Sequence, residues 1–135
     1  PPRLRELEIP STLKVLVVED DYVNRYSICQ MLTAHGISVD EAIDGHDAIA
    51  MLMKSSYDLV LMDIQMPNLN GVEATRIIRE HPEIENRNSL PIVALTAHAM
   101  SGDRERFLDA GMNDYISKPV DLSLLEDMLT RIISA

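Results

Sequence analysis

The sequence is poor in cysteine, aromatic residues and basic residues, and each shortage narrows what the chain can do. Cys29 is its only cysteine, so no internal disulfide can form, and a reducing cytoplasm is the expected compartment. No stretch is long and apolar enough for a membrane-spanning helix or a signal-peptide core. Lys and Arg number 12 against 22 Asp and Glu, a formal net charge of -10. This acidity disfavours direct binding of nucleic acid or of an anionic membrane.

The length of 135 residues fits a single domain with one core. The first thirteen residues, PPRLRELEIPSTL, contain three prolines and precede any periodic apolar pattern. We therefore interpret residues 1–13 as a linker or tether, which suggests further chain upstream, and residues 14–135 as one folded domain.

Short apolar runs alternate with longer segments of helical spacing in the rest of the chain. Strands are predicted over 15–18, 37–41, 59–62, 92–96 and 114–117. Helices are predicted over 22–35, 46–55, 71–81 and 101–110, and a last helix follows a cap at Asp121 or Ser123. Gly36 and Gly111 stand where a helix end favours a residue that tolerates positive φ.

This order, a strand followed by a helix five times over, predicts an α/β fold with a doubly wound parallel sheet. Parallel strands need crossover connections, and right-handed crossovers place helices on both faces of the sheet. In such sheets the functional crevice lies beyond the carboxyl ends of the strands. The residues that follow the strands are therefore the first candidates for a site.

Polar residues end or follow four of the predicted strands: Glu19 and Asp20 follow the first, Asp63 follows the third, Thr96 ends the fourth and Lys118 follows the fifth. Each alone is more often a solvated loop or turn residue, so the argument rests on their joint occurrence. Crowded carboxylates repel one another unless a cation intervenes, which favours Mg²⁺, or Mn²⁺ in its place, with oxygen ligands. A carboxylate beside such a cation can attack phosphorus while an ammonium and a hydroxyl bind the phosphoryl oxygens.

The segments VLVVEDD, DLVLMDIQMPNLNG, PIVALTA and DYISKP resemble the signature segments of response-regulator receiver domains, in the same order and spacing, over residues 14–135. The resemblance implies a flavodoxin-like sheet of five parallel strands in the order 2-1-3-4-5 with five helices. It also implies that the domain takes a phosphoryl group from a phosphohistidine on a histidine kinase or histidine phosphotransfer domain. Such a domain catalyses only its own phosphorylation and dephosphorylation.

Carried over by position, the resemblance assigns Asp63 as the phosphoacceptor and Lys118 as the lysine that acts with it. Asp20 and Asp63 would bind the metal directly, and the longer Glu19 would bind it through a water molecule. The backbone carbonyl of Gln65 would be a further ligand.

The resemblance also implies roles for residues in the conformational switch and in the lifetime of the phosphoryl group. Thr96 would be the switch hydroxyl and Tyr115 the switch aromatic, and their movement would remodel the face of the fourth helix, fifth strand and fifth helix, where a downstream protein binds. Gln65 and His98 occupy positions that tune the rate of dephosphorylation. The Lys118-Pro119 peptide would be cis.

The Pro-rich leader and the segment TAHAMSGDRERFLDAGMNDYISKP resemble receivers fused to hybrid sensor histidine kinases. The full-length protein would then be a kinase, and this domain would lie on the cytoplasmic side of the inner membrane. A stand-alone or DNA-binding regulator is the alternative.

Two other classes share parts of this chemistry. A nucleotide-binding or flavin-binding module would need a turn after the first strand that binds phosphate through amide groups. The chain has EDDYVNR there, and this acidic segment would repel phosphate. A Mg²⁺-dependent phosphohydrolase would need a second acid and a substrate-covering cap, and no insertion is long enough for a cap.

Overall fold

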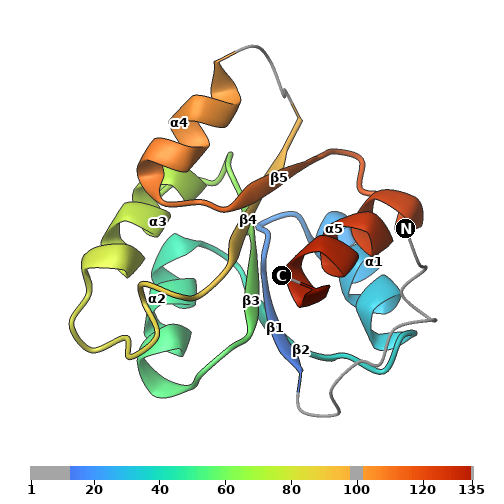
Figure 1. Cartoon of the computed structure of the whole chain (residues 1–135), viewed down its shortest axis with the longest axis horizontal. Helices are drawn as coiled ribbons and strands as arrows, with labels where there is room; N and C mark the ends of the chain where they lie inside the picture. Colours follow the sequence, from blue (N-terminus) through green and yellow to red (C-terminus); the bar gives the residue numbers. More distant parts are fainter. Residues whose placement is uncertain (1–12, 98–101, 135) are drawn as a thin grey trace.

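The computed structural model describes residues 13–97 and 102–134 (Figure 1). The predicted linker therefore lies outside the described residues except for Leu13, and so does His98. The elements are β1 (Lys14–Val18), α1 (Tyr22–Thr33), β2 (Ser38–Ala42), α2 (Gly45–Lys54), β3 (Leu59–Asp63), α3 (Gly71–Glu80), β4 (Ile92–Thr96), α4 (Asp103–Ala110), β5 (Asp114–Ser117) and α5 (Leu122–Ser134).

The five strands form one sheet in the order β2-β1-β3-β4-β5, and every neighbouring pair is parallel. This confirms the predicted fold class and strand order. The third strand runs one residue further than predicted, so that Asp63 pairs with Leu95 and is itself a strand residue. The second strand begins one residue later, because the amide of Ile37 donates to Leu32 O at the end of α1.

The helices cover both faces of the sheet, with α1 and α5 on one side and α2, α3 and α4 on the other (Figure 1). Alternate strand residues divide between two core clusters: Leu16 and Val18 pack on the side of α2 and α3, whereas Val15 and Val17 pack on the side of α1 and α5. Burial on both faces explains why the strand sequences are continuous apolar runs. Within residues 13–97 and 102–134, no helix combines the length and apolar character needed to cross a membrane.

The helix ends follow the predicted signals with small shifts. Gly36 and Gly111 have φ values of 77° and 106°, as expected for residues that end a helix in the left-handed region. Asp121, rather than Ser123, caps α5, because its Oδ1 accepts from the amide of Leu124 at 2.8 Å. The third helix stops at Glu80 since His81 is already extended. The described part of the fourth helix starts at Asp103, and residue 101 lies outside the described chain.

Candidate functional site

The carboxyl ends of β1, β3 and β5 bring three charged side chains into contact. Lys118 Nζ lies 2.8 Å from Asp63 Oδ1, in a hydrogen bond and ion pair, and 2.8 Å from Glu19 Oε1. The contact with Glu19 Oε1 is an ion pair. Asp63 is only 2% exposed and Glu19 is fully buried. The predicted convergence of the first, third and fifth strand ends is therefore present.

The acidic run after β1 divides into three different environments. Glu19 points into the interior, whereas Asp20 is exposed. Asp21 is the N-cap of α1, and its Oδ2 accepts from the amide of Asn24 at 2.9 Å. The run thus supplies one buried carboxylate, one carboxylate at the surface of the site and one helix cap.

The cluster has the composition and charge expected for a divalent cation. One carboxylate oxygen from each of Glu19, Asp20 and Asp63 lies within 4.8 Å of the other two. With all three carboxylates ionised, the cluster and the single ammonium of Lys118 would carry two negative charges, which a hard cation with oxygen ligands would neutralise. The residues therefore fit a divalent cation.

The two buried carboxylates perturb each other's titration. Burial, followed by the neighbouring Glu19, raises the pKa of Asp63 from 3.8 to about 7, against the opposing effect of Lys118. Burial alone would raise the pKa of Glu19 too, but its contacts with Asp63 and Lys118 outweigh burial and lower it. Without a cation, the pair therefore retains a proton up to near-neutral pH.

Backbone hydrogen bonds at the start and end of the loop between β3 and α3 hold Asp63 in place. The amide of Ile64 donates to Leu95 O and the amide of Gly71 donates to Ile64 O, each at 3.0 Å. The amide of Gln65 donates to Asp63 Oδ1 at 3.3 Å, and the Gln65 side chain is exposed at the mouth of the site. A Cβ on Gly71 would lie only 2.2 Å from the carbonyl oxygen of Asp63. The glycine is a site residue that sequence reasoning missed.

Thr96 and Tyr115 lie on the neighbouring strands β4 and β5, where Thr96 pairs with Ser117 and Tyr115 with Ala94. Thr96 is buried at the end of β4, and its carbonyl accepts from the amide of Lys118 at 2.8 Å. Tyr115 is half-buried and packs against Phe107 of α4, with ring centres 6.2 Å apart. The Lys118-Pro119 peptide is cis, as the resemblance implied. The structure thus places the two predicted switch residues next to the cluster and next to α4, respectively.

Comparison with known proteins shows which family the chain resembles. The family model of the response regulator receiver domain matches residues 15–130. The chain is 45% identical over 121 residues to hybrid signal transduction histidine kinase I of Dictyostelium discoideum, covering 86% of this chain and 7% of that protein. It is 41% identical over 107 residues to sensor protein GacS of Pseudomonas syringae pv. syringae, covering 79% of this chain and 12% of that protein. The chain therefore spans a small part of these curated relatives.

Solved structures agree with the family model. The receiver domain of sensor histidine kinase PA1611 from Pseudomonas aeruginosa has a TM-score of 0.81 and 43% identity, with 91% of this chain and 98% of that chain covered, and it holds a magnesium ion in its active site cleft. Chemotaxis protein CheY4 of Vibrio cholerae has a TM-score of 0.82 and 27% identity, covering 89% and 98% of the two chains. With its sheet order, its acidic strand-end cluster and these matches, the chain belongs to the response regulator receiver domain family.

Proposed function

We propose that this domain is the phosphoacceptor of a two-component phosphorelay and that Asp63 is the residue that takes the phosphoryl group. The observation that carries the proposal is the position of Asp63, which contacts Lys118 Nζ at 2.8 Å and shares a cluster with Glu19 and Asp20. The donor is a phosphohistidine on a histidine kinase or a histidine phosphotransfer domain. Transfer of the phosphoryl group forms a bond between an Asp63 carboxylate oxygen and phosphorus and breaks the bond from phosphorus to the imidazole nitrogen.

The residues around Asp63 divide the work of transfer between them. Lys118 neutralises charge on Asp63 before transfer and can follow the negative charge onto a phosphoryl oxygen afterwards. The hydroxyl of Thr96 is the donor proposed for a second phosphoryl oxygen. Because Asp63 is buried, these donors act in a setting largely free of competing water.

Mg²⁺, or Mn²⁺ in its place, is the proposed cofactor. Asp20, Asp63 and the backbone carbonyl of Gln65 would bind it directly, and Glu19 through water. When bound, such a cation supplies charge stabilisation to the phosphoryl oxygens. The buried Glu19, already paired with Lys118, suits an indirect ligand better than a direct one.

An apolar patch on α1 is the proposed binding surface for the protein that donates the phosphoryl group. Tyr22, Val23 and Tyr26 are 65%, 70% and 53% exposed, and they lie on α1, whose first residue, Tyr22, directly follows Asp21. A donor histidine can reach the buried Asp63 only if its protein rests on the rim of the site. Exposed aromatic side chains beside that rim offer the apolar contact area that protein interfaces use.

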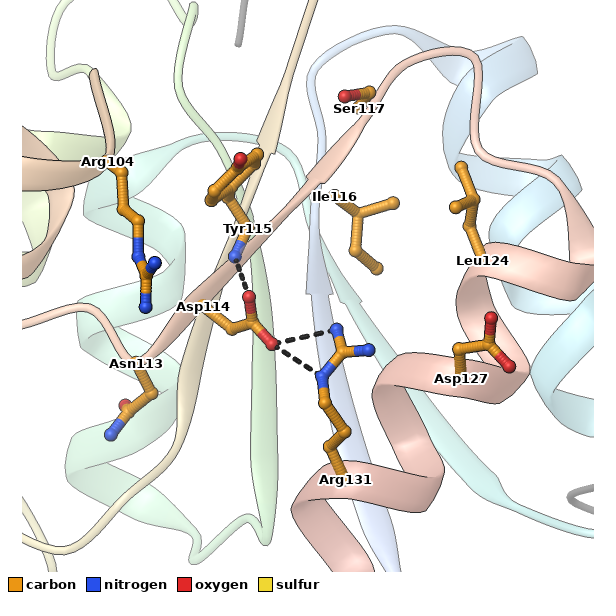
Figure 2. Close-up of a pocket in the computed structure, with 9 residues that line it drawn as sticks. All are labelled: Arg104, Asn113, Asp114, Tyr115, Ile116, Ser117, Leu124, Asp127 and Arg131. Carbon is orange, nitrogen blue, oxygen red and sulfur yellow. Dashed lines mark hydrogen bonds and ion pairs between the residues drawn. The ribbon is translucent and has the colours of Figure 1, made fainter. Parts of the chain in front are cut away.

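The downstream partner is proposed to bind the face formed by α4, β5 and α5. A cavity of about 480 Å³ opens there, lined by residues that include Arg104, Tyr115, Leu124 and Asp127. Figure 2 shows Arg131 reaching from α5 to Asp114 of β5, with its Nη2 2.9 Å from Asp114 Oδ2. Since Tyr115 lines this cavity and packs on α4, its movement with Thr96 would alter the surface on offer.

The wider context is also a proposal. We infer that the domain is part of a hybrid histidine kinase and lies in the cytoplasm, on the cytoplasmic side of the inner membrane if the kinase spans it. Identity of 45% to a segment of a hybrid signal transduction histidine kinase and of 41% to a segment of a sensor protein supports this attachment over a stand-alone or DNA-binding regulator. Residue 98 has a proposed rate-tuning role with Gln65, and it lies outside the described residues.

The test is phosphorylation of the purified chain by a small phosphodonor with Mg²⁺, read by intact mass and peptide mapping. The native chain should gain one phosphoryl group on the peptide that contains Asp63. Asp63→Asn should gain none, because the carboxamide lacks the nucleophilic oxygen. Equal labelling of the two proteins would refute the assignment, and multiple turnover of a free phosphomonoester would favour a phosphohydrolase instead.

A further inference from the structure

Arg25 is a nearly buried cation that binds the backbone of the acidic loop. Its Nη1 donates to the carbonyl oxygen of Glu19 at 2.8 Å, and its Nε donates to Glu41 Oε1 at 2.9 Å. The side chain is 12% exposed, and its guanidinium carbon lies 5.6 Å from the centre of the Tyr22 ring. The guanidinium is therefore held by β2 and by its own helix while it reaches the end of β1.

The carbonyl that Arg25 binds belongs to the peptide unit joining Glu19 to Asp20. The amide of Glu19 donates to Ala42 O of β2 at 3.1 Å, so both backbone groups of Glu19 are fixed. Because a peptide unit is planar, fixing its oxygen fixes the direction in which the chain enters Asp20. Asp20 itself is exposed, so its position depends on the backbone on either side of it, which Arg25 holds at Glu19 and the Asp21 cap of α1 holds after it.

We propose that Arg25 is a positioning residue for metal binding, which keeps the Asp20 carboxylate where it can share a cation with Glu19 and Asp63. The inference rests on the proposed function, since it takes the acidic cluster as the Mg²⁺ site. Glu41 serves as the outer anchor that keeps the guanidinium directed at the Glu19 carbonyl.

Loss of the Arg25 charge and loss of its positioning of Asp20 would change the Mg²⁺ affinity in opposite directions. A guanidinium near a cation repels it, so loss of its charge alone should tighten Mg²⁺ binding. Loss of positioning should weaken binding, because Asp20 would then be ordered only when the metal arrives. The sign of the change in the dissociation constant therefore separates the two.

The experiment measures Mg²⁺ binding to Arg25→Met by titration calorimetry at fixed ionic strength. We expect the Kd to rise about fivefold, the loss that one net hydrogen bond implies. Arg25→Lys retains the charge but lacks the planar fork that reaches the carbonyl and Glu41 together, so it should also bind more weakly. In the metal-free protein, the amide resonance of Asp20 should shift in Arg25→Met, since its peptide carbonyl has lost a donor. At saturating Mg²⁺, labelling by the phosphodonor should return close to the native rate.

The matched control is Arg76→Met, because Arg76 is exposed on α3 and the charge change is the same. Its Kd should equal the native value or fall slightly. Binding by Arg25→Met as tight as that of Arg76→Met, or an unmoved Asp20 resonance, would overturn the inference. If Arg25→Met does not fold, native affinity in Arg25→Lys would overturn it. A native chain that binds no Mg²⁺ and takes no phosphoryl group would instead overturn the proposed function.

Discussion

Asp63 is a buried acid whose surroundings favour a proton when no cation is present. Lys118 alone does not offset its burial and the neighbouring Glu19, which together raise its pKa to about 7. A cation bound to the cluster must displace this proton. Metal binding at the site is therefore coupled to pH near neutrality.

This coupling gives a testable stability profile in a metal chelator. The folded protein holds a proton on Asp63 that the unfolded chain releases above pH 3.8, so this contribution is complete at low pH and is lost as pH rises through about 7. Asp63→Asn cannot titrate, and its unfolding free energy relative to the native chain should rise between about pH 5 and about pH 7, by at most about 1.4 kcal/mol per pH unit, and level off above. Urea unfolding across that range measures the difference.

The lowered pKa of Glu19 does not obscure this result. Its contribution is present above the ordinary value of 4.5 and is lost only as pH falls through the lowered pKa. The two effects thus occupy separate pH ranges. Native and Asp63→Asn curves that stay parallel above pH 5 would show that Asp63 is ionised throughout.

Asp20 and Lys118 should have different roles, Asp20 in metal binding and Lys118 in phosphoryl transfer. Asp20→Ala removes a proposed metal ligand and should weaken Mg²⁺ binding by roughly tenfold or more. Lys118→Ala removes no ligand, so it should keep Mg²⁺ affinity within about threefold while slowing labelling by the phosphodonor. Calorimetry and labelling rates on both variants test the division. Loss of Mg²⁺ binding in both would contradict it.

At the scale of elements, the close approach of α3 to β3 holds Asp63, the proposed phosphoacceptor, in place. Gly71 opens α3 with a capping box made by Asn70 and Glu73, and its amide donates to Ile64 O. A side chain at this position would meet the Asp63 carbonyl oxygen and Met62 Cγ. The helix can begin so near the strand only because the residue there has no Cβ.

Gly71→Ala should therefore cost roughly 2–4 kcal/mol of stability and slow phosphorylation, since either α3 or the end of β3 must move. Gly36→Ala is the matched control: its φ is 77°, but no atom lies within 4 Å of the added Cβ. It should cost about 1 kcal/mol and leave labelling at the native rate. Chemical unfolding and labelling rates test both, and equal labelling of the two variants would show that the contact does not position Asp63.

The strand and helix pattern made the elements predictable, whereas their close contacts were not. Alternation of apolar runs and helical spacing placed all five strands within a residue or so, and the strand ends pointed to Glu19, Asp63 and Lys118. The contacts of Arg25 with the Glu19 carbonyl and of Gly71 with Asp63 depend on how segments distant in sequence approach one another. Sequence spacing carries no information on such approaches.

For the whole molecule, the net charge of -10 opposes compaction, and the acidic cluster concentrates part of it. Mg²⁺ at about 100 times its Kd should therefore stabilise the fold by about 2.7 kcal/mol through binding to the native state alone. NaCl of matched ionic strength controls for general screening. Thermal or urea unfolding measures both, and the double variant Asp20→Ala with Asp63→Asn should lose the specific part. Equal stabilisation by the two salts would argue against a Mg²⁺ site.

The partners at the centre of the site are far apart along the chain, since Asp63 and Lys118 are separated by 55 positions in the sequence. No local segment or partly formed hairpin can assemble them, because each comes from the end of a different strand of the finished sheet. Only a correctly folded molecule would therefore be able to accept a phosphoryl group. In a cell, a misfolded copy would be silent in signalling rather than wrongly active.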